Sequence, residues 1–162
     1  MIAGLPRGSG VVFRAFGAPD AAALGRALGR QARRRGVLFL VGADRGLAAR
    51  LGADGVHLPQ RLAVRAGTIA ALRRRFLVTA AAHDLPAALR AHRAGVDAIV
   101  VSAVFASASP TAGAAMGVMR FASLIRRAGA PAYALGGVNA GTVRRLRGSG
   151  AVGVAAVGGL LA

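Results

Sequence analysis

Two pairs of glycines have the spacing of a phosphate-binding site. Gly136-Gly137 and Gly158-Gly159 each end an apolar stretch with the composition of a buried strand, and the basic segment 139–148 between them has helical potential. This order predicts a strand–helix–strand unit whose parallel strands bring both pairs to one edge of a sheet. Glycine lets a backbone approach a ligand and present its N–H groups, so both pairs are candidates for binding phosphate. The alternative is close packing of helix against strand.

Polar side chains at other predicted strands could also contact a ligand. Arg14 belongs to the apolar stretch 10–16, where an unpaired charge is costly, so we expect it to bind an anion at the mouth of the sheet or to reach solvent. His83 stands at a strand end beside Asp84, and it is a candidate ligand contact or part of a helix cap with Asp84. His57 lies on an apolar strand, which favours a structural role.

The loop near residue 107 carries hydroxyl groups. Ser107 and Ser109 could donate hydrogen bonds to a phosphate, or they could be ordinary loop residues. The sequence therefore leaves their role open.

The charged residues exclude several kinds of chemistry. The chain has no cysteine, all 22 basic residues are arginine, and all five acids are scattered aspartates. Disulfides, thiolate and cysteine–zinc sites, Schiff-base lysines and glutamate acid–base catalysis are therefore excluded, and we predict no metal cluster. The net charge of +17 suggests phosphate ligands or nucleic acid as partners, or else a solvated arginine surface. An aromatic content of 4% argues against nucleic acid, because stacking residues usually accompany the charge.

An internal repeat indicates how these residues are positioned. The segments 51–58, 94–101 and 149–156 each combine a glycine stop, a tight turn and a β-branched strand. With the stretches between them, they predict strands beginning near residues 11, 37, 55, 76, 97, 131 and 152. The predicted helices cover residues 21–35, 45–51, 64–74, 85–93, 118–128 and 140–147. We expect Asp20 to cap the first of these helices and Gly36 to end it.

Strands that alternate with helices predict a parallel α/β sheet. The regular spacing favours a TIM (β/α)8-type barrel, formed by residues 1–162 as a single domain, in which we expect the first strand and the last helix to be lacking. A doubly wound open sheet is the alternative. Because open strand edges favour pairing with another chain, we expect a homo-oligomer in which a second copy covers the open side.

No part of the sequence predicts a membrane segment. No apolar run reaches the length of a membrane helix, and the first residues lack the pattern of a signal peptide. We therefore expect a cytoplasmic protein with no membrane partner.

At residues 51–60 the chain resembles the thiamine phosphate synthase family and its relatives, the thiazole tautomerases. Further stretches that agree in order and spacing are 12–14, 82–84, 101–111 and 134–137 with 153–158. The resemblance covers residues 10–160. It implies a (β/α)8 barrel that joins a hydroxymethylpyrimidine diphosphate to a thiazole phosphate in thiamine biosynthesis, with Mg²⁺ assisting the departure of diphosphate.

The resemblance also implies binding residues in this chain. They are Arg14 for diphosphate, Gln60, His83, Ser107 and Ser109 for substrate, and Gly136, Gly137, Val157 and Gly158 for phosphate. The family's magnesium-binding carboxylates fall on Gly42-Ala43 and near Leu62, and its lysines are missing as well. Mg²⁺ is thus expected from the family, but its ligands are not present here. The histidine of the tautomerases falls on Ala103, so no catalytic residue is assigned.

Three functions follow from these observations. The first is a thiamine-phosphate synthase-like transferase acting on small phosphorylated substrates. The second is a catalytically degenerate family member that binds a phosphorylated ligand without turnover, which the missing carboxylates favour. The third is an arginine-rich binder of nucleic acid. The sequence leaves open whether the chain is an enzyme.

Overall fold

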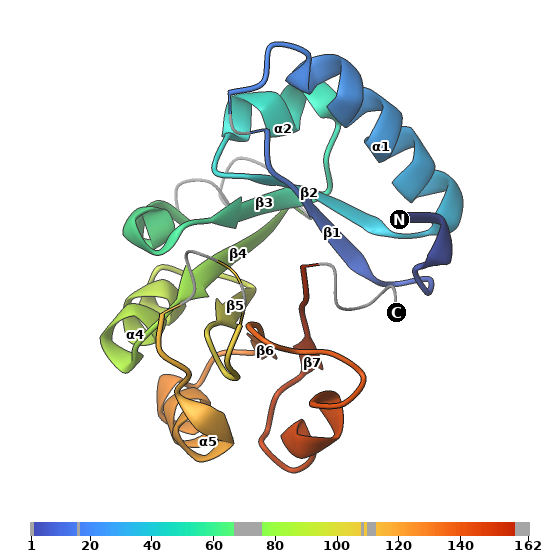
Figure 1. Ribbon diagram of the computed structural model, residues 1–162. Coiled ribbons are helices and arrows are strands. Elements are labelled where there is room, and N and C mark those ends of the chain that lie inside the picture. Colours follow the sequence, from blue (N-terminus) through green and yellow to red (C-terminus); the bar gives the residue numbers. More distant parts are fainter. Residues whose placement is uncertain (1, 16, 67–75, 108, 110–112, 158–162) are drawn as a thin grey trace.

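Parallel strands form one curled sheet in the computed structural model, which describes residues 2–15, 17–66, 76–107, 109 and 113–157 (Figure 1). The described residues contain seven strands in the order β1-β2-β3-β4-β5-β6-β7. Their bounds are Gly10–Phe13, Leu38–Gly42, Gly55–Leu58, Leu77–Ala82, Ala98–Val101, Ala132–Ala134 and Gly153–Val154. The sequential order confirms the TIM-type α/β fold and excludes the doubly wound alternative, because a doubly wound sheet reverses its strand order.

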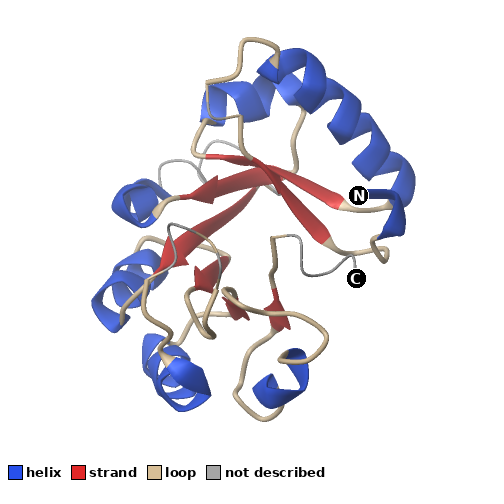
Figure 2. Ribbon diagram, viewed as in Figure 1, coloured by secondary structure: helices blue, strands red, loops and turns tan. Residues whose placement is uncertain are grey.

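Helices cover the outer face of this curl (Figure 2). They are α1 (Ala21–Arg35), α2 (Arg45–Leu51), α4 (Leu85–Arg93) and α5 (Gly117–Ala128), with short 3₁₀ turns η1 (Ile2–Gly4), η2 (Gln60–Arg65) and η3 (Val143–Leu146). The core lies between helices and sheet, where Phe39, Ile99 and Phe121 are fully buried. None of the helices in the described ranges has the length and hydrophobicity needed to cross a bilayer.

The predicted helices at 21–35, 45–51 and 85–93 are observed with the same bounds, and α5 begins one residue early. Gly36 ends α1 in the left-handed conformation, as expected, but Asp20 makes no side-chain cap. The predicted helix at 64–74 falls mostly outside the described residues.

The helix predicted at 140–147 is wrong. It shrinks to the 3₁₀ turn η3 because the side chains before it satisfy the backbone locally. The carboxamide oxygen of Asn139 accepts bonds from the N–H groups of Gly141 and Thr142, and Thr142 Oγ1 donates to the carbonyl of Gly137.

The inner face of the curl is partly accessible to solvent. Successive side chains of a strand point to opposite faces of the sheet. Phe39 and Val41 face the helices, and Leu38 and Leu40 therefore face inward. The inward-facing Val12, Leu38 and Tyr133 are 40%, 39% and 38% exposed. Among the described strands, β1 and β7 each pair on one side only. A second copy covering these edges stays a prediction, which light scattering would test.

The aspartates of the internal repeat join neighbouring strands of the sheet. Asp54 and Asp97 occupy equivalent positions just before β3 and β5, and each bonds twice to the preceding strand. The N–H of Asp54 donates to the Phe39 carbonyl, and its carboxylate accepts from the Phe39 N–H at 2.8 Å. Asp97 makes the same pair of bonds to Val78, with the carboxylate at 2.7 Å. The third repeat has Val152 here and keeps only the backbone bond, to Ala132. The aspartates thus align neighbouring strands at their amino ends.

Removing either carboxylate should therefore weaken the fold. We expect Asp54→Ala and Asp97→Ala each to lower the free energy of unfolding by about 1–2 kcal/mol, because a strand N–H loses its acceptor. Asp20→Ala is the matched control, since Asp20 makes no side-chain cap bond. Urea denaturation measures all three, and equal stabilities would contradict the assignment.

Candidate functional site

The loop after β6 contains the first predicted glycine pair. Gly136 and Gly137 have φ values of +94° and +62°, a left-handed backbone that favours glycine. A Cβ on Gly136 would lie 2.8 Å from Ala103 Cα, and one on Gly137 would lie 2.8 Å from Phe105 Cβ. The turn therefore packs against the loop that follows β5, and Phe105 N–H donates to the Gly136 carbonyl. The pair is thus closely packed, but against a loop rather than at a contact of helix with strand.

The same turn presents N–H groups suited to an anion. Within the described ranges, no group accepts a hydrogen bond from the N–H of Gly136, Gly137 or Val138. Consecutive N–H groups in a left-handed turn form a concavity that binds anions. In the neighbouring loop after β5, the ring of Phe105 makes a cation–π contact with the guanidinium of Arg145. The guanidinium carbon lies 4.9 Å from the ring centroid. Packing and anion binding are therefore compatible properties of this turn.

The other predicted phosphate ligands are less well defined. Val157 is 94% exposed, beyond the short strand β7, and Gly158 lies outside the described residues. Ser107 Oγ accepts a bond from the N–H of Ser109 at 3.3 Å, and both residues are exposed. Ala106, the residue before Ser107, lies against the glycine turn, because a Cβ on Gly137 would clash with its carbonyl oxygen. Ser107 is therefore close to this turn in space.

Arg14 follows β1 at its carboxyl end and lies beside the next strand. Its Cγ would be 3.1 Å from a Cβ on Gly42, the last residue of β2. Gly42 is in register with His57 of β3, so Arg14 and His57 are near one another at the inner face. Burial, and to a smaller extent the charge of Arg14, lower the pKa of His57 from 6.5 to about 4. His57 is therefore neutral near pH 7, and its Nδ1 lies 2.9 Å from Thr79 Oγ1.

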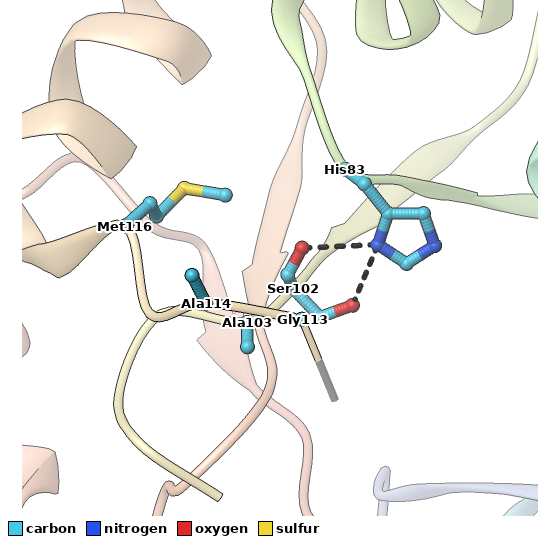
Figure 3. A pocket seen from close by; sticks show the side chains of 6 residues that line it. All are labelled: His83, Ser102, Ala103, Gly113, Ala114 and Met116. Atoms are coloured by element: carbon cyan, nitrogen blue, oxygen red, sulfur yellow. Dashed lines mark hydrogen bonds between the residues drawn. The ribbon is translucent and has the colours of Figure 1, made fainter. Parts of the chain in front are cut away.

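His83 joins three successive strand ends. Its backbone N–H donates to Gln60 Oε1 at 2.9 Å, and its Nδ1 lies 3.0 Å from the carbonyl oxygen and 3.1 Å from the Oγ of Ser102 (Figure 3). A carbonyl oxygen only accepts, so Nδ1 carries the proton and Nε2, on the far side of the ring, is an acceptor when the ring is neutral. Asp84 caps α4 by accepting from the Ala87 N–H, without help from His83. Gln60 thus positions the backbone of His83, and its predicted contact with substrate stays a prediction.

A pocket adjoins this histidine. Its volume is about 370 Å³, and it is lined by His83, Ser102, Ala103, Gly113, Ala114 and Met116 (Figure 3). Ala103 touches both the pocket and the glycine turn, so the two features are continuous. Sequence reasoning missed Ser102 and Met116 as site residues. Ser102 directly follows β5, and this position at a strand end was the available signal; nothing in the sequence pointed to Met116.

The carboxylates do not fit a magnesium site. Every aspartate of the chain lies in the described part, and no group of three potential metal ligands occurs there. Asp44 and Asp84 cap helices through Leu47 and Ala87, while Asp54 and Asp97 bind strand N–H groups at the opposite, amino end of the sheet. Mg²⁺ prefers a near-octahedral set of oxygens that includes carboxylates. The residues present do not assemble such a set.

Comparisons with known proteins agree with this architecture. The family model described as thiamine monophosphate synthase matches residues 9–160. A thiamine-phosphate synthase of Chromobacterium violaceum is 39% identical over 138 residues, covering 82% of this chain and 64% of that protein. One from Thioalkalivibrio sulfidiphilus is 34% identical, covering 85% of this chain and 65% of that protein. The chain therefore spans just under two thirds of the length of these relatives.

A solved structure shows the same fold. Thiamine phosphate pyrophosphorylase from Pyrococcus furiosus superposes with a TM-score of 0.77 at 23% identity, covering 92% of this chain and 72% of that one. The sequence match over nearly the whole chain and the superposition of the curled sheet confirm the resemblance predicted from residues 51–60. The chain belongs to the thiamine monophosphate synthase family.

Proposed function

We propose that this chain is a thiamine-phosphate synthase-like transferase, which joins a hydroxymethylpyrimidine diphosphate to a thiazole phosphate. The observation that carries the proposal is the glycine turn at 136–138, whose N–H groups have no acceptor among the described residues and which adjoins the pocket beside His83. The turn would hold the thiazole phosphate. The pocket, at about 370 Å³, has the size of a small-ligand site.

The chain's own residues would act mainly by electrostatics and positioning. In the proposed reaction the bond from the pyrimidine methylene carbon to diphosphate breaks, and the thiazole nitrogen forms a new bond to that carbon. The guanidinium of Arg14 would stabilise the negative charge that develops on the departing diphosphate. His57 is neutral near pH 7, so the positive charge at this point comes from Arg14 and not from the imidazole. The glycine turn would align the thiazole by its phosphate.

A second candidate is a protein that binds the phosphorylated ligand without turnover. The observation that favours it is the engagement of four of the five aspartates in caps and strand bonds, which leaves no carboxylate cluster at the strand ends within the described residues. Both candidates share the phosphate site and differ in the chemistry.

Calorimetric titration with thiazole phosphate, followed by a product assay with the pyrimidine diphosphate, separates these candidates. Binding with product formation supports the transferase, and binding without product supports the second candidate. Absence of binding would refute both.

Arg14 gives the sharper test of the diphosphate end. We expect Arg14→Gln to weaken binding of the pyrimidine diphosphate by roughly 10–100-fold, the worth of a charge-assisted hydrogen bond, and to leave thiazole phosphate binding unchanged. Arg30→Gln, on the exposed surface of α1, removes the same charge as a matched control. Equal losses in the two variants would indicate a general charge effect and count against Arg14 as a ligand.

A further inference from the structure

The turn after β2 has a backbone conformation that suits asparagine or aspartate, but the residue at this position is an alanine. Ala43 adopts φ +62°, a conformation uncommon for residues other than glycine and most often tolerated by asparagine and aspartate. Its N–H donates to the carbonyl of His57 at 2.9 Å, which fixes the turn at the carboxyl end of β2 and β3. The methyl group of Ala43 therefore stands where a short carboxylate would suit the backbone best.

The next residue does not replace that carboxylate. Asp44 is one position further on, and its Oδ1 accepts the Leu47 N–H at 2.8 Å as the N-cap of α2. Moving an N-cap aspartate to a metal would break its bond to the helix N–H and lower the stability of the fold. Asp84, the other aspartate that caps a helix at this end, is committed in the same way to Ala87.

Positive charge occupies the neighbourhood instead. Arg14 packs against Gly42, the residue before Ala43, and its charge reaches His57 across the strand. With a net charge of +17, the chain repels a free divalent cation as a whole. Among the described residues, a diphosphate at this position would meet a guanidinium and no carboxylate that could share a metal with it.

We propose that this chain binds diphosphate as the free anion, and that Mg²⁺ weakens this binding. The inference rests on the proposed function, because it concerns the same Arg14 end of the site. Mg²⁺ and the guanidinium compete for the same phosphate oxygens, and a magnesium complex carries less negative charge for Arg14 to attract. Mg²⁺ should raise the affinity for diphosphate at a site with carboxylates and lower it at a site without them.

The experiment is a calorimetric titration of the whole chain with inorganic diphosphate at constant ionic strength, in EDTA and in excess Mg²⁺. We expect the dissociation constant to rise roughly tenfold in Mg²⁺, about the loss of one charge-assisted contact. Tighter binding in Mg²⁺, or no binding in EDTA, would overturn the proposal. Thiazole phosphate is titrated in parallel. If it binds while diphosphate fails, the proposed phosphate site stands and only this inference falls.

Restoring the missing side chain tests the cause. Ala43→Asp should fold at least as well as the parent chain, because aspartate tolerates this backbone better than alanine. In this variant we expect Mg²⁺ to strengthen diphosphate binding, reversing the sign seen in the parent chain. Ala49→Asp, on the exposed surface of α2, adds the same charge away from the strand ends and should leave the sign unchanged. An Ala43→Asp variant in which Mg²⁺ still weakens binding would refute the role assigned to this turn.

Discussion

Replacing Gly137 with alanine is expected to lower the free energy of unfolding by about 4 kcal/mol, combining a left-handed backbone with an overpacked contact. The residue has φ +62°, and its new Cβ would lie 2.8 Å from Phe105 Cβ and press on the Ala106 carbonyl. Backbone atoms of the loop after β5 cannot move aside as the end of a flexible side chain can. Chemical denaturation measures the loss.

Gly148→Ala separates the two causes. Gly148 has φ +74°, yet a Cβ there would meet no atom within 4 Å. This control should lose only about 1–2 kcal/mol, the cost of the left-handed conformation. If both variants lost the same amount, the contact between the glycine turn and the β5 loop would contribute nothing, and the packing of this turn would need another explanation.

The same variant connects stability to ligand binding. If the N–H groups of Gly136, Gly137 and Val138 hold the thiazole phosphate, any shift of this turn away from Phe105 moves all three donors. We expect the folded fraction of Gly137→Ala to bind thiazole phosphate at least roughly tenfold more weakly, because one displaced charge-assisted donor has about that effect. Gly148→Ala should bind as the parent chain does. Unchanged affinity in Gly137→Ala would contradict the proposed phosphate site.

His57 should make the stability of the fold depend on pH. Burial, and then the charge of Arg14, lower its pKa from 6.5 to about 4 in the folded chain. Below pH 6.5 the unfolded chain takes up a proton that the folded chain refuses, so the free energy of unfolding falls as pH drops from about 6.5 to 4. The contribution is complete above this window, and the loss across it amounts to about 3 kcal/mol.

His57→Asn tests this linkage. Asparagine can still bond to Thr79 but does not titrate, so the variant should lose about 3 kcal/mol less than the parent chain between about pH 7 and pH 4. His92→Asn, on the exposed surface of α4, is the control and should follow the parent. The absolute stability of each variant is irrelevant, because only its change with pH is compared. Parallel curves for His57→Asn and the parent chain would rule out the buried neutral histidine.

Local patterns were sufficient to predict most of the fold. The helices at 21–35, 45–51 and 85–93 follow from apolar periodicity and glycine stops, and the sequential sheet follows from strands that alternate with helices. The repeat at 51–58 and 94–101 correctly predicted two strands. Its aspartates accept hydrogen bonds from the backbone of the neighbouring strand, so the pattern marks where each strand begins. Propensity failed at 140–147, where the side chains of Asn139 and Thr142 bond to the backbone in place of helical bonds.

By itself, the sequence determined the family, the α/β architecture and the glycine turn at 136–137, since each depends on residues close together along the chain. Only the tertiary structure decided which side chains meet. Gln60, His83 and Ser102 come from three separate strand ends, and Arg14 reaches His57 across Gly42. It also decided that the aspartates serve caps and strands rather than a metal. The physical reason is that strand register and sheet curvature set these distances, and neither is written in any local stretch of residues.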